Sequence, residues 1–518
     1  MSNDARDQSL GTLPPGCCGL SASRCASCFK APLSRRSFLA GSGSAAAAPS
    51  AGGRLFGAAR PAPGRLPLRV QPVFLFTSRQ RRERTSWRWS AEIYGERQVA
   101  EECERIRREL ETLKRGAEFP LEILPLVPVD SKEQAARISP DGYDAAILYA
   151  SARNPDVLEA LAKPEKWNLI FLRHKSGPIY YMYIGLHGHM LRKQRDSFLD
   201  KSISLDDVVV DEYPDLLWRL RALGGLKNTL GRRILTIGNP GGWGAGGRLA
   251  PERARERWAF DLVSTSYADL ERRLKSALGN TALTRTAVQS ASRYAARKGV
   301  RLEASRDALS KAFVLLEVFR DCLQDTGAGV LTINGCMGTV MGVSGTTACV
   351  PLSVLNDEGL LALCEGDFVS APAGVLLHFI SGRPVFMCNG SFPYGGVVLA
   401  SHCTAPSRMD GTNGDPVRVL THYESDFGAA PRVEMRKGQT VTVLDADFDA
   451  KRYLGFRGEI RDTPFHPICR TQLEIGVAGD GSRLAGELRG WHWMICYGDY
   501  VKEAGYAARK AGLDWLAA

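Results

Sequence analysis

The sequence of 518 residues lacks the features that mark several special classes of protein. No uninterrupted apolar run approaches the roughly 18 residues that a membrane-spanning helix requires, and no Gly-x-Ser-x-Gly nucleophile motif occurs. The composition is 44% hydrophobic, 24% charged and 8% aromatic, which excludes a wholly disordered, collagen-like or coiled-coil chain. We therefore expect a soluble protein with no membrane span, about two to four domains and a core large enough for a buried site.

A disulfide framework is also absent, although the chain has 13 cysteines. Cys17, Cys18, Cys25 and Cys28 lie close to the N-terminus, and their one Cys-x-x-Cys motif lacks a second, suitably spaced pair. This pattern argues against a zinc knuckle. The remaining cysteines are scattered, mostly within apolar runs, and we expect them to be buried free thiols.

The net charge of +11 does not by itself indicate a nucleic-acid partner. Residues 1–67 contain eight basic and two acidic residues, a net charge of +6, which leaves +5 for the rest of the chain. A second basic cluster, residues 79–84, is followed by Trp87 and Trp89 and has the composition of a phosphate-binding patch. A solvated surface loop is the favoured interpretation, so no nucleic-acid partner is predicted.

Residues 1–67 show no helix or strand periodicity, and they contain a motif typical of export signals. The motif has paired arginines, Arg35 and Arg36, then Phe38 and Leu39, and a weakly apolar Gly/Ser/Ala stretch follows it. It resembles a twin-arginine signal, so we expect a periplasmic or otherwise exported mature protein. A disordered basic arm on a cytoplasmic protein is the alternative.

From residue 68 onward, short apolar strands alternate with amphipathic helices, which predicts parallel sheets with right-handed crossovers. The last strand of this series is expected at 385–387. Short strands with turn residues between them follow residue 400, at 417–421, 432–435, 440–444, 453–460 and 469–476, as in an antiparallel barrel. The predicted fold class is α/β, with two doubly wound Rossmann-like α/β domains followed by a C-terminal antiparallel β-barrel-like domain. The predicted divisions are a leader over 1–67, an N-terminal α/β domain over 68–205, a second α/β domain over 206–400 and a β-rich domain over 401–518.

A glycine-rich segment, residues 242–247, satisfies the Gly-x-Gly-x-x-Gly pattern of dinucleotide-binding loops. Extra residues separate it from the preceding strand and from the following helix, and Asp261 falls at the beginning of its strand instead of the end. A glycine loop near a ligand is therefore favoured. An exported NAD(P)-dependent oxidoreductase remains the least favoured of three functional hypotheses.

A dispersed set of metal-ligand residues offers a different site. Glu365 follows one expected strand and precedes a helix, which places it at the carboxyl end of a sheet. His402 follows another expected strand, and His492 lies in the segment Gly-Trp-His-Trp. One carboxylate and two imidazoles suit a divalent cation that binds sugar hydroxyls.

Around these residues the sequence resembles the L-fucose isomerase/L-arabinose isomerase superfamily, particularly its fucose-isomerase-like branch. Four segments of the sequence match the family: residues 362–367, 384–387, 400–406 and 490–493. The last of these blocks is followed by a fifth match, Tyr-Gly-Asp-Tyr at 497–500. The resemblance is strong over residues 330–515 and only architectural over 68–330.

The resemblance implies a metal-dependent sugar isomerase that interconverts an aldose and a ketose through a cis-enediol. It assigns Mn²⁺ or another divalent cation as the cofactor, with Glu365, His402 and His492 as ligands and Glu365 also as an acid–base group. It further implies a monosaccharide substrate and a homo-oligomer, a trimer or a hexamer. Five residues near the matching blocks are expected to contact the substrate: Arg408, Asp410, His466, Arg470 and Trp491.

The sequence departs from the family at one position that matters for catalysis. Where the isomerases carry a second acidic residue after the strand at 385–387, this chain has Cys388 and Asn389. Asn389 can offer a carbonyl oxygen to a cation at the catalytic centre, but it cannot transfer a proton. A non-catalytic sugar-binding relative is therefore the main alternative to an isomerase.

Overall fold

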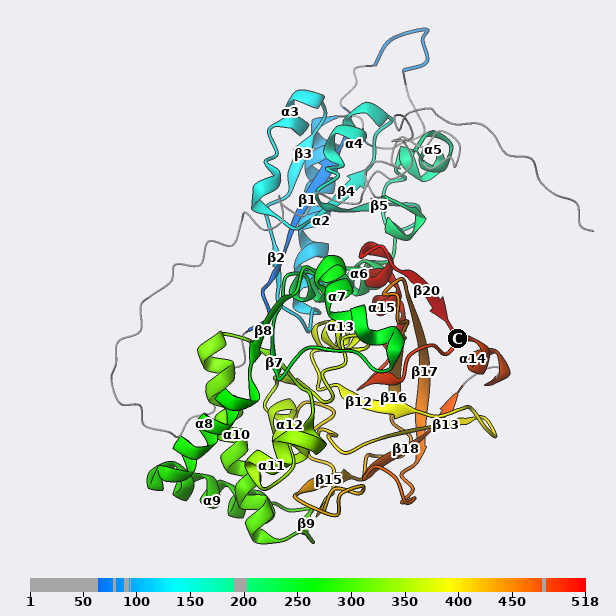
Figure 1. Cartoon of the computed structure of the whole chain (residues 1–518). Coiled ribbons are helices and arrows are strands. Elements are labelled where there is room, and N and C mark those ends of the chain that lie inside the picture. Colours follow the sequence, from blue (N-terminus) through cyan, green and yellow to red (C-terminus); the bar gives the residue numbers. More distant parts are fainter. Residues whose placement is uncertain (1–63, 78–80, 88–92, 94, 191–202, 478–480) are drawn as a thin grey trace, which may run out of the picture.

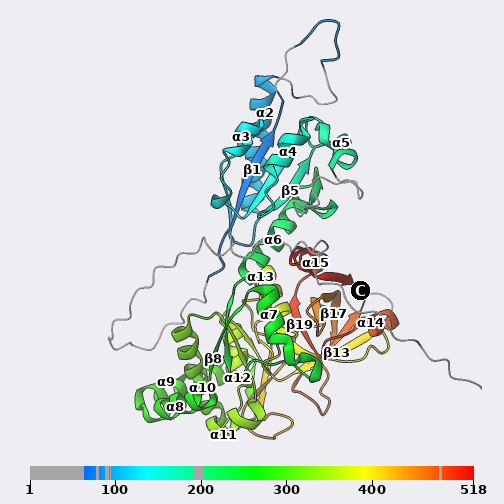
Figure 2. The same ribbon diagram turned by 45° about the horizontal axis from the view of Figure 1, so that its top comes forward.

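The computed structural model describes residues 64–77, 81–87, 93, 95–190, 203–477 and 481–518. The predicted leader, with its paired arginines, lies outside the described residues. The described chain is a mixed α/β structure with two parallel sheets and a closed antiparallel barrel, as the sequence pattern predicts. Figures 1 and 2 show the first sheet in a lobe of its own, with helix α6 at the junction with the remainder.

The N-terminal sheet is parallel throughout, in the order β2-β1-β4-β5-β6, with β3 also paired to β1. Its central strands β4 and β5 are buried at every position, as expected for a parallel sheet covered on both faces. The strands are β1 (Leu68–Leu75), β2 (Leu121–Ile123), β3 (Val127–Val129), β4 (Ala145–Ala150), β5 (Trp167–Leu172) and β6 (Val208–Val210). The helices are α2 (Glu96–Arg115), α3 (Lys132–Ala136), α4 (Pro155–Leu161) and α5 (Tyr181–Met190).

The second parallel sheet has the order β11-β10-β7-β8. Its strands are β7 (Arg233–Ile237), β8 (Asp261–Thr265), β10 (Val330–Ile333) and β11 (Leu361–Leu363). The helices around it are α6 (Tyr213–Thr229), α7 (Ala250–Trp258), α8 (Tyr267–Gly279), α9 (Thr281–Ala295), α10 (Arg306–Thr326), α11 (Met341–Ser344), α12 (Cys349–Asp357) and α13 (Ala371–Ser381). Helices α6 and α13 pack closely because Gly225 presents no side chain: a Cβ there would lie 2.4 Å from Ile380 Cγ1.

Six antiparallel strands close into a barrel in the order β16-β19-β12-β13-β18-β17 and back to β16. The strands are β12 (Phe386–Gly390), β13 (Val397–His402), β16 (Thr440–Ala446), β17 (Arg452–Asp462), β18 (Thr471–Val477) and β19 (His492–Tyr497). Strand β20 (Asp514–Ala517) adds to β17 in parallel, after helix α15 (Val501–Lys510). One hydrophobic core contains Leu331 of the second sheet together with Phe386 and Ile495 of the barrel, so the sheet and the barrel pack directly against each other.

The structure corrects two strand assignments. The strand expected at 385–387 as the last of the second α/β layer is β12 of the barrel, because Phe386 pairs antiparallel with Ile495 of β19 and the strand turns back into β13. The strands expected in the barrel at 417–421 and 432–435 are β14 (Val417–Leu420) and β15 (Ala430–Val433). These two form a separate three-stranded sheet with β9 (Val300–Leu302), a partner more than 100 residues earlier that local sequence patterns do not reveal.

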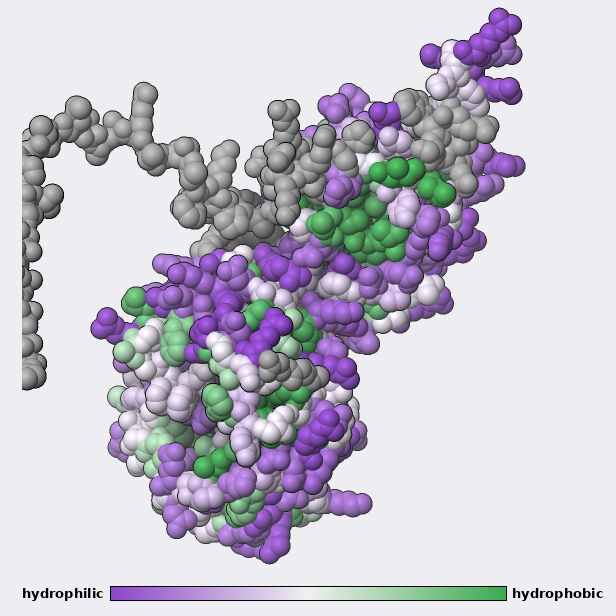
Figure 3. All heavy atoms as spheres, turned by 90° about the vertical axis from the view of Figure 1, so that its right-hand side faces the viewer, coloured by the Kyte–Doolittle hydropathy of each residue, from purple (hydrophilic) through white to green (hydrophobic). Residues whose placement is uncertain are grey.

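Within the described ranges, no single helix combines the length and hydropathy needed to cross a membrane. One helix pair bent by 93°, Cys336–Ser344 with Cys349–Asp357, meets that test only jointly. On the face drawn in Figure 3, hydrophobic residues gather on the N-terminal lobe beside the residues drawn in grey. Exposed apolar side chains of this lobe include Ile184, Leu205 and Val210.

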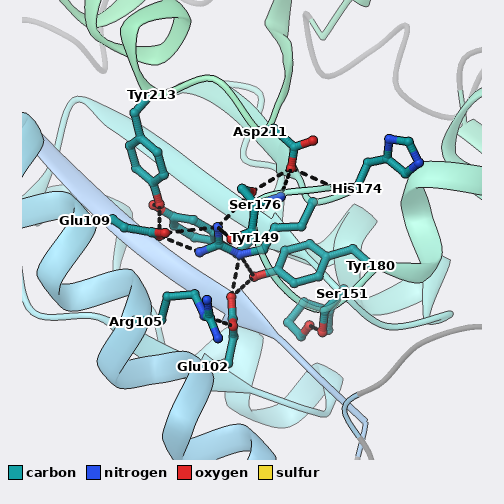
Figure 4. Close-up of polar contacts among 12 residues, drawn as sticks. Glu102, Arg105, Glu109, Tyr149, Ser151, His174, Ser176, Tyr180, Asp211 and Tyr213 are labelled. Carbon is teal, nitrogen blue, oxygen red and sulfur yellow. Dashed lines mark hydrogen bonds and ion pairs between the residues drawn. The ribbon is translucent and has the colours of Figure 1, made fainter.

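A buried ionic network joins helix α2 to the carboxyl ends of β4 and β5 in the N-terminal lobe (Figure 4). Arg173, which is completely buried, donates to Glu102 Oε1 over 2.6 Å and to Glu109 Oε1 over 3.2 Å. The hydroxyls of Tyr180 and Tyr213 donate to the same two carboxylates, each over 2.6 Å. The charges are thus paired with one another, and we assign this network a structural role.

Replacing Arg173 by methionine is expected to reduce the free energy of unfolding by about 3–5 kcal/mol, because the buried Glu102 carboxylate would lose its fully buried counter-charge and keep only the partly exposed Arg105. Arg105 provides the matched control: it also pairs with Glu102, over 3.1 Å, but 42% of its side chain is exposed. Arg105→Met should cost less than about 1 kcal/mol. Urea unfolding followed by circular dichroism measures both changes, and equal losses would contradict the structural assignment.

Candidate metal centre

Glu365 stands at the carboxyl edge of the second parallel sheet, directly beyond β11. Its backbone has φ of +63°, and Gly366 follows with φ of +60°. A left-handed conformation is uncommon for glutamate and costs of the order of 1–3 kcal/mol, a type of strain found mainly at functional sites. The turn is held in place by the glycine loop after β7, because Gly241 N–H donates to Gly366 O over 3.1 Å and Gly241 O accepts from Phe368 N–H over 2.9 Å.

The two histidines come from barrel strands that lie on either side of β12. His402 ends β13 and His492 begins β19. Asn389 of β12 pairs with Ser401 on one side and with His492 on the other. Antiparallel pairing therefore brings together residues that are about 90 positions apart in the chain, and it places the Asn389 side chain beside that of His492.

Glu365 bridges the two imidazoles. Its Oε1 lies 3.3 Å from His402 Nε2, and its Oε2 lies 3.3 Å from His492 Nε2. The three ligand atoms are all within 4.8 Å of one another, and both histidines are buried. The three side chains form a candidate metal centre.

The outer nitrogens of both rings have partners that orient the inner nitrogens. Asp367 Oδ2 accepts from His492 Nδ1 over 2.7 Å, and Thr404 Oγ1 lies 3.0 Å from His402 Nδ1. Asp367 is itself fixed by N–H groups of Trp243 and Val369, which donate to its Oδ1. A carboxylate behind a histidine is the usual way to present the other ring nitrogen to a cation.

Charge pairing sets the protonation of the centre. Burial alone would raise the pKa of Glu365, but hydrogen bonds and charge interactions with His402 and His492 outweigh it and hold that pKa well below its usual range. Burial alone would lower the pKa of His492, but the hydrogen bond to Asp367 and the Glu365 carboxylate raise it to about 9. Without a cation, His492 is therefore protonated at neutral pH.

Two buried atoms fit a bound cation. Among the described residues, Asn389 Oδ1 is inaccessible to solvent and has no hydrogen-bond partner, and His492 Nε2 is equally inaccessible and faces Glu365 Oε2 at 3.3 Å. Both are cation-ligand atoms, and a cation shared with Glu365 and His402 would satisfy them. A set of two imidazoles, one carboxylate and one amide oxygen suits a divalent first-row metal such as Mn²⁺.

The centre opens into a cavity of about 610 Å³, which is large enough for a small ligand such as a monosaccharide. Its walls include Glu365, His402 and Asn389, and the segments after β7 and β10. Trp243 and Trp491 lie in its wall with their rings stacked, 4.4 Å apart and inclined by 16°. The sequence indicated a glycine loop near a ligand, but it did not single out Trp243, whose Nε1–H donates to Glu365 Oε2 over 3.0 Å.

Of the five residues expected to contact substrate, only Trp491 is among the residues that line this cavity. Asp410 caps a local turn and pairs with Arg436 over 2.7 Å. Arg470 donates to the carbonyl of Thr421 over 2.7 Å. The structure also does not place Arg408 or His466 in the cavity wall.

Other polar residues of the cavity wall were not predicted. His422 and Glu424 come from the segment after β14, and Asn334 follows β10. Nothing in the local sequence distinguishes these side chains from ordinary loop residues. The β14–β15 segment that carries His422 and Glu424 packs against helix α12 and barrel strand β18.

A comparison with models of known protein families gave no match, and a comparison with curated protein sequences gave no significant match. The geometry of the centre and the resemblance seen in the sequence are therefore the grounds on which a function is inferred.

The affinity for Mn²⁺ is expected to rise about tenfold for each pH unit between pH 6 and 8. His492 has a pKa of about 9 in the metal-free protein, so below that pH a cation has to displace its proton. Isothermal titration in buffers of different ionisation enthalpy should show the release of about one proton per ion. In Asp367→Asn, the lower pKa of His492 should reduce the competition from its proton, so the dependence of affinity on pH should weaken. At pH 8 the affinity should still fall below that of the wild type, because the carboxylate that orients the ring is lost. An affinity that is independent of pH in the wild type would contradict this account.

Proposed function

We propose that this protein is a metal-dependent sugar isomerase that interconverts an aldose and a ketose through a cis-enediol. The observation that carries the proposal is the Glu365–His402–His492 cluster, with the unpartnered Asn389 oxygen, beside a cavity large enough to hold a monosaccharide. The cation would be Mn²⁺ or a similar divalent ion. The proposal includes the finer fold assignment, two Rossmann-like α/β domains and a barrel as in the fucose/arabinose isomerase superfamily.

Different residues of the cavity would bind the cation and orient the sugar. Glu365, His402, His492 and Asn389 would hold the cation, which supplies Lewis-acid polarisation of the sugar oxygens at C1 and C2. The paired rings of Trp243 and Trp491 would pack against the apolar face of the sugar and fix its orientation.

Proton transfer between C1 and C2 needs a base that the cation does not occupy. Glu365 is poorly suited to act alone, since a carboxylate whose pKa is held low is a weak base. Asn389 cannot accept or release a proton. Apart from Glu365, Glu424 is the one carboxylate that lines the cavity within the described part of the chain, and we assign it the proton transfer.

Deuterium exchange tests the function. The protein, loaded with Mn²⁺, is incubated with a panel of aldoses and ketoses in D₂O, and deuterium entry at C1 and C2 is followed by NMR. We expect exchange with at least one sugar. Glu424→Gln should keep Mn²⁺ affinity but slow the exchange by about 100-fold or more. If Mn²⁺ binds and no sugar exchanges, the non-catalytic sugar-binding alternative replaces the proposal.

The nicotinamide-dependent alternative has little structural support. The acidic residue that such a motif requires, Asp261, lies at the amino end of β8 and pairs with Arg233 over 2.6 Å. The glycine loop is at the opposite, carboxyl edge of the same sheet, where it binds the Glu365 turn instead. A ribose held by the loop would therefore be out of reach of Asp261.

We also propose, from the sequence, that the protein is exported and forms a homo-oligomer. The leader resembles a twin-arginine signal, and the family resemblance implies a trimer or a hexamer. The exposed apolar side chains of the N-terminal lobe are compatible with such an assembly. Light scattering on the purified protein should give three or six times the mass of one chain, which is 56.5 kDa for the full sequence with its leader. A monomeric mass would remove the oligomer from the proposal.

A further inference from the structure

Five thiols line the cavity beside the candidate metal centre, and they arrive from five separate parts of the fold. They are Cys336 after β10, Cys349 at the start of α12, Cys364 after β11, Cys403 after β13 and Cys469 before β18. The other described cysteines lie outside this wall. None of the described cysteines forms a disulfide. Neither the metal centre nor sugar binding, as proposed above, uses any of these sulfurs.

Two of the five thiols, Cys403 and Cys469, are held against each other by the barrel. The antiparallel pairing of β13 and β18 ends with the pair His402 and Thr471. The two cysteines lie just beyond this last pair, on adjacent chain segments. Their thiols are in hydrogen-bond contact, and they pack together with Cys349 and Ala430 in a small cluster of their own. Adjacent antiparallel segments have the backbone separation that a disulfide spans.

The two sulfurs differ in access and in surroundings. Cys469 is only partly buried, whereas Cys403 is 2% exposed. The backbone N–H of Arg470 donates to Cys403 Sγ over 3.4 Å, so that sulfur already accepts a hydrogen bond. Contact with Cys403 and burial both raise the pKa of the Cys469 thiol, so access and not acidity makes Cys469 the sulfur that a small disulfide meets first.

We propose that Cys403 and Cys469 form a dithiol–disulfide pair that reacts with small-molecule disulfides entering the cavity. The Cys469 sulfur loses its proton to solvent and attacks one sulfur of the small disulfide, which breaks that S–S bond and releases one thiol. The Cys403 sulfur then loses its proton and attacks Cys469 Sγ, which releases the second thiol. Two protein thiols are oxidised to one disulfide, and one small disulfide is reduced to two thiols.

The pair is coupled to the candidate metal centre through the chain. Cys403 directly follows His402, so a bond between Cys403 and Cys469 would tie the end of β13 to the start of β18 next to that histidine. The inference does not depend on isomerase activity, because it concerns the thiols alone. It can therefore succeed or fail independently of the proposed function.

Mass spectrometry tests the pair directly. The reduced full chain is incubated with oxidised glutathione, unreacted thiols are alkylated after denaturation, and the digest is mapped. We expect two fewer alkylated cysteines and a cross-linked peptide that joins Cys403 to Cys469. Cys403→Ser should instead retain one glutathione on Cys469, and Cys469→Ser should leave Cys403 free to be alkylated.

A cysteine far from the cavity provides the matched control. Cys103 lies on helix α2 of the N-terminal lobe, and Cys103→Ser should give the same cross-link as the wild type. The proposal is overturned if both Cys403 and Cys469 are alkylated after oxidation, or if either is joined to a different cysteine.

Discussion

Replacing Glu365 by glutamine is expected to lower the affinity for Mn²⁺ by about 100-fold or more. The substitution keeps the size of the side chain but removes the carboxylate that faces both His402 Nε2 and His492 Nε2. A neutral amide cannot compensate the charge of the ion, and loss even of residues that only orient ligands commonly costs 10- to 100-fold. The signal of free Mn²⁺ in electron paramagnetic resonance, recorded during a titration, measures the affinity.

Glu424→Gln is the matched control for this experiment, since it removes a carboxylate from the same cavity without touching the cluster. Its Mn²⁺ affinity should stay close to that of the wild type. If both variants lose affinity equally, the ion is held by the general negative charge of the cavity. The assignment of Glu365 as a ligand would then be wrong.

Changing Asn389 to aspartate is expected to raise the affinity for Mn²⁺, whereas Glu365→Gln lowers it. The buried Asn389 Oδ1 has no hydrogen-bond partner, so a carboxylate there would add a charged ligand atom beside His492, the ring that faces Glu365. Without metal the two carboxylates would repel each other and lower the melting temperature. With Mn²⁺ we expect about tenfold tighter binding than in the wild type, and a larger rise in melting temperature on adding the ion.

Asn389→Leu tests the same position by removing its ligand atom. It removes the carbonyl oxygen and should weaken Mn²⁺ binding, with little loss of stability in the metal-free protein, because the oxygen has no partner to lose. Thermal unfolding with and without Mn²⁺ compares the three proteins. Equal metal-induced shifts in all three would show that position 389 does not contact the ion.

The fold class was predictable because its signals are local. Buried strands such as β4 and β10 are short apolar runs bounded by turn residues, and the amphipathic helices between them imply parallel pairing. The assignment of β12 was wrong for a physical reason: its partners are β19, about 100 residues later, and the hairpin strand β13. The pattern of apolar residues within 385–390 predicts a strand, but it does not indicate which sheet that strand joins.

The candidate site was predictable only in part. Glu365, His402 and His492 could be found because each lies at a strand end, and because the family resemblance links the three positions. Trp243 and Glu424 could not, since they reach the cavity through loop conformation. Asp410 is the opposite case: it lies close in sequence to the matching blocks, but a local turn and Arg436 engage its carboxylate.

Anomalous scattering from crystals grown with Mn²⁺ tests the central claim most directly, because it locates the ion without any assumption about the reaction. The account predicts one strong peak at the manganese absorption edge, about 2 Å from His402 Nε2, His492 Nε2 and a Glu365 oxygen. The peak should be absent from crystals of Glu365→Gln. Manganese bound at another place, with the three side chains arranged as they are here, would contradict the account.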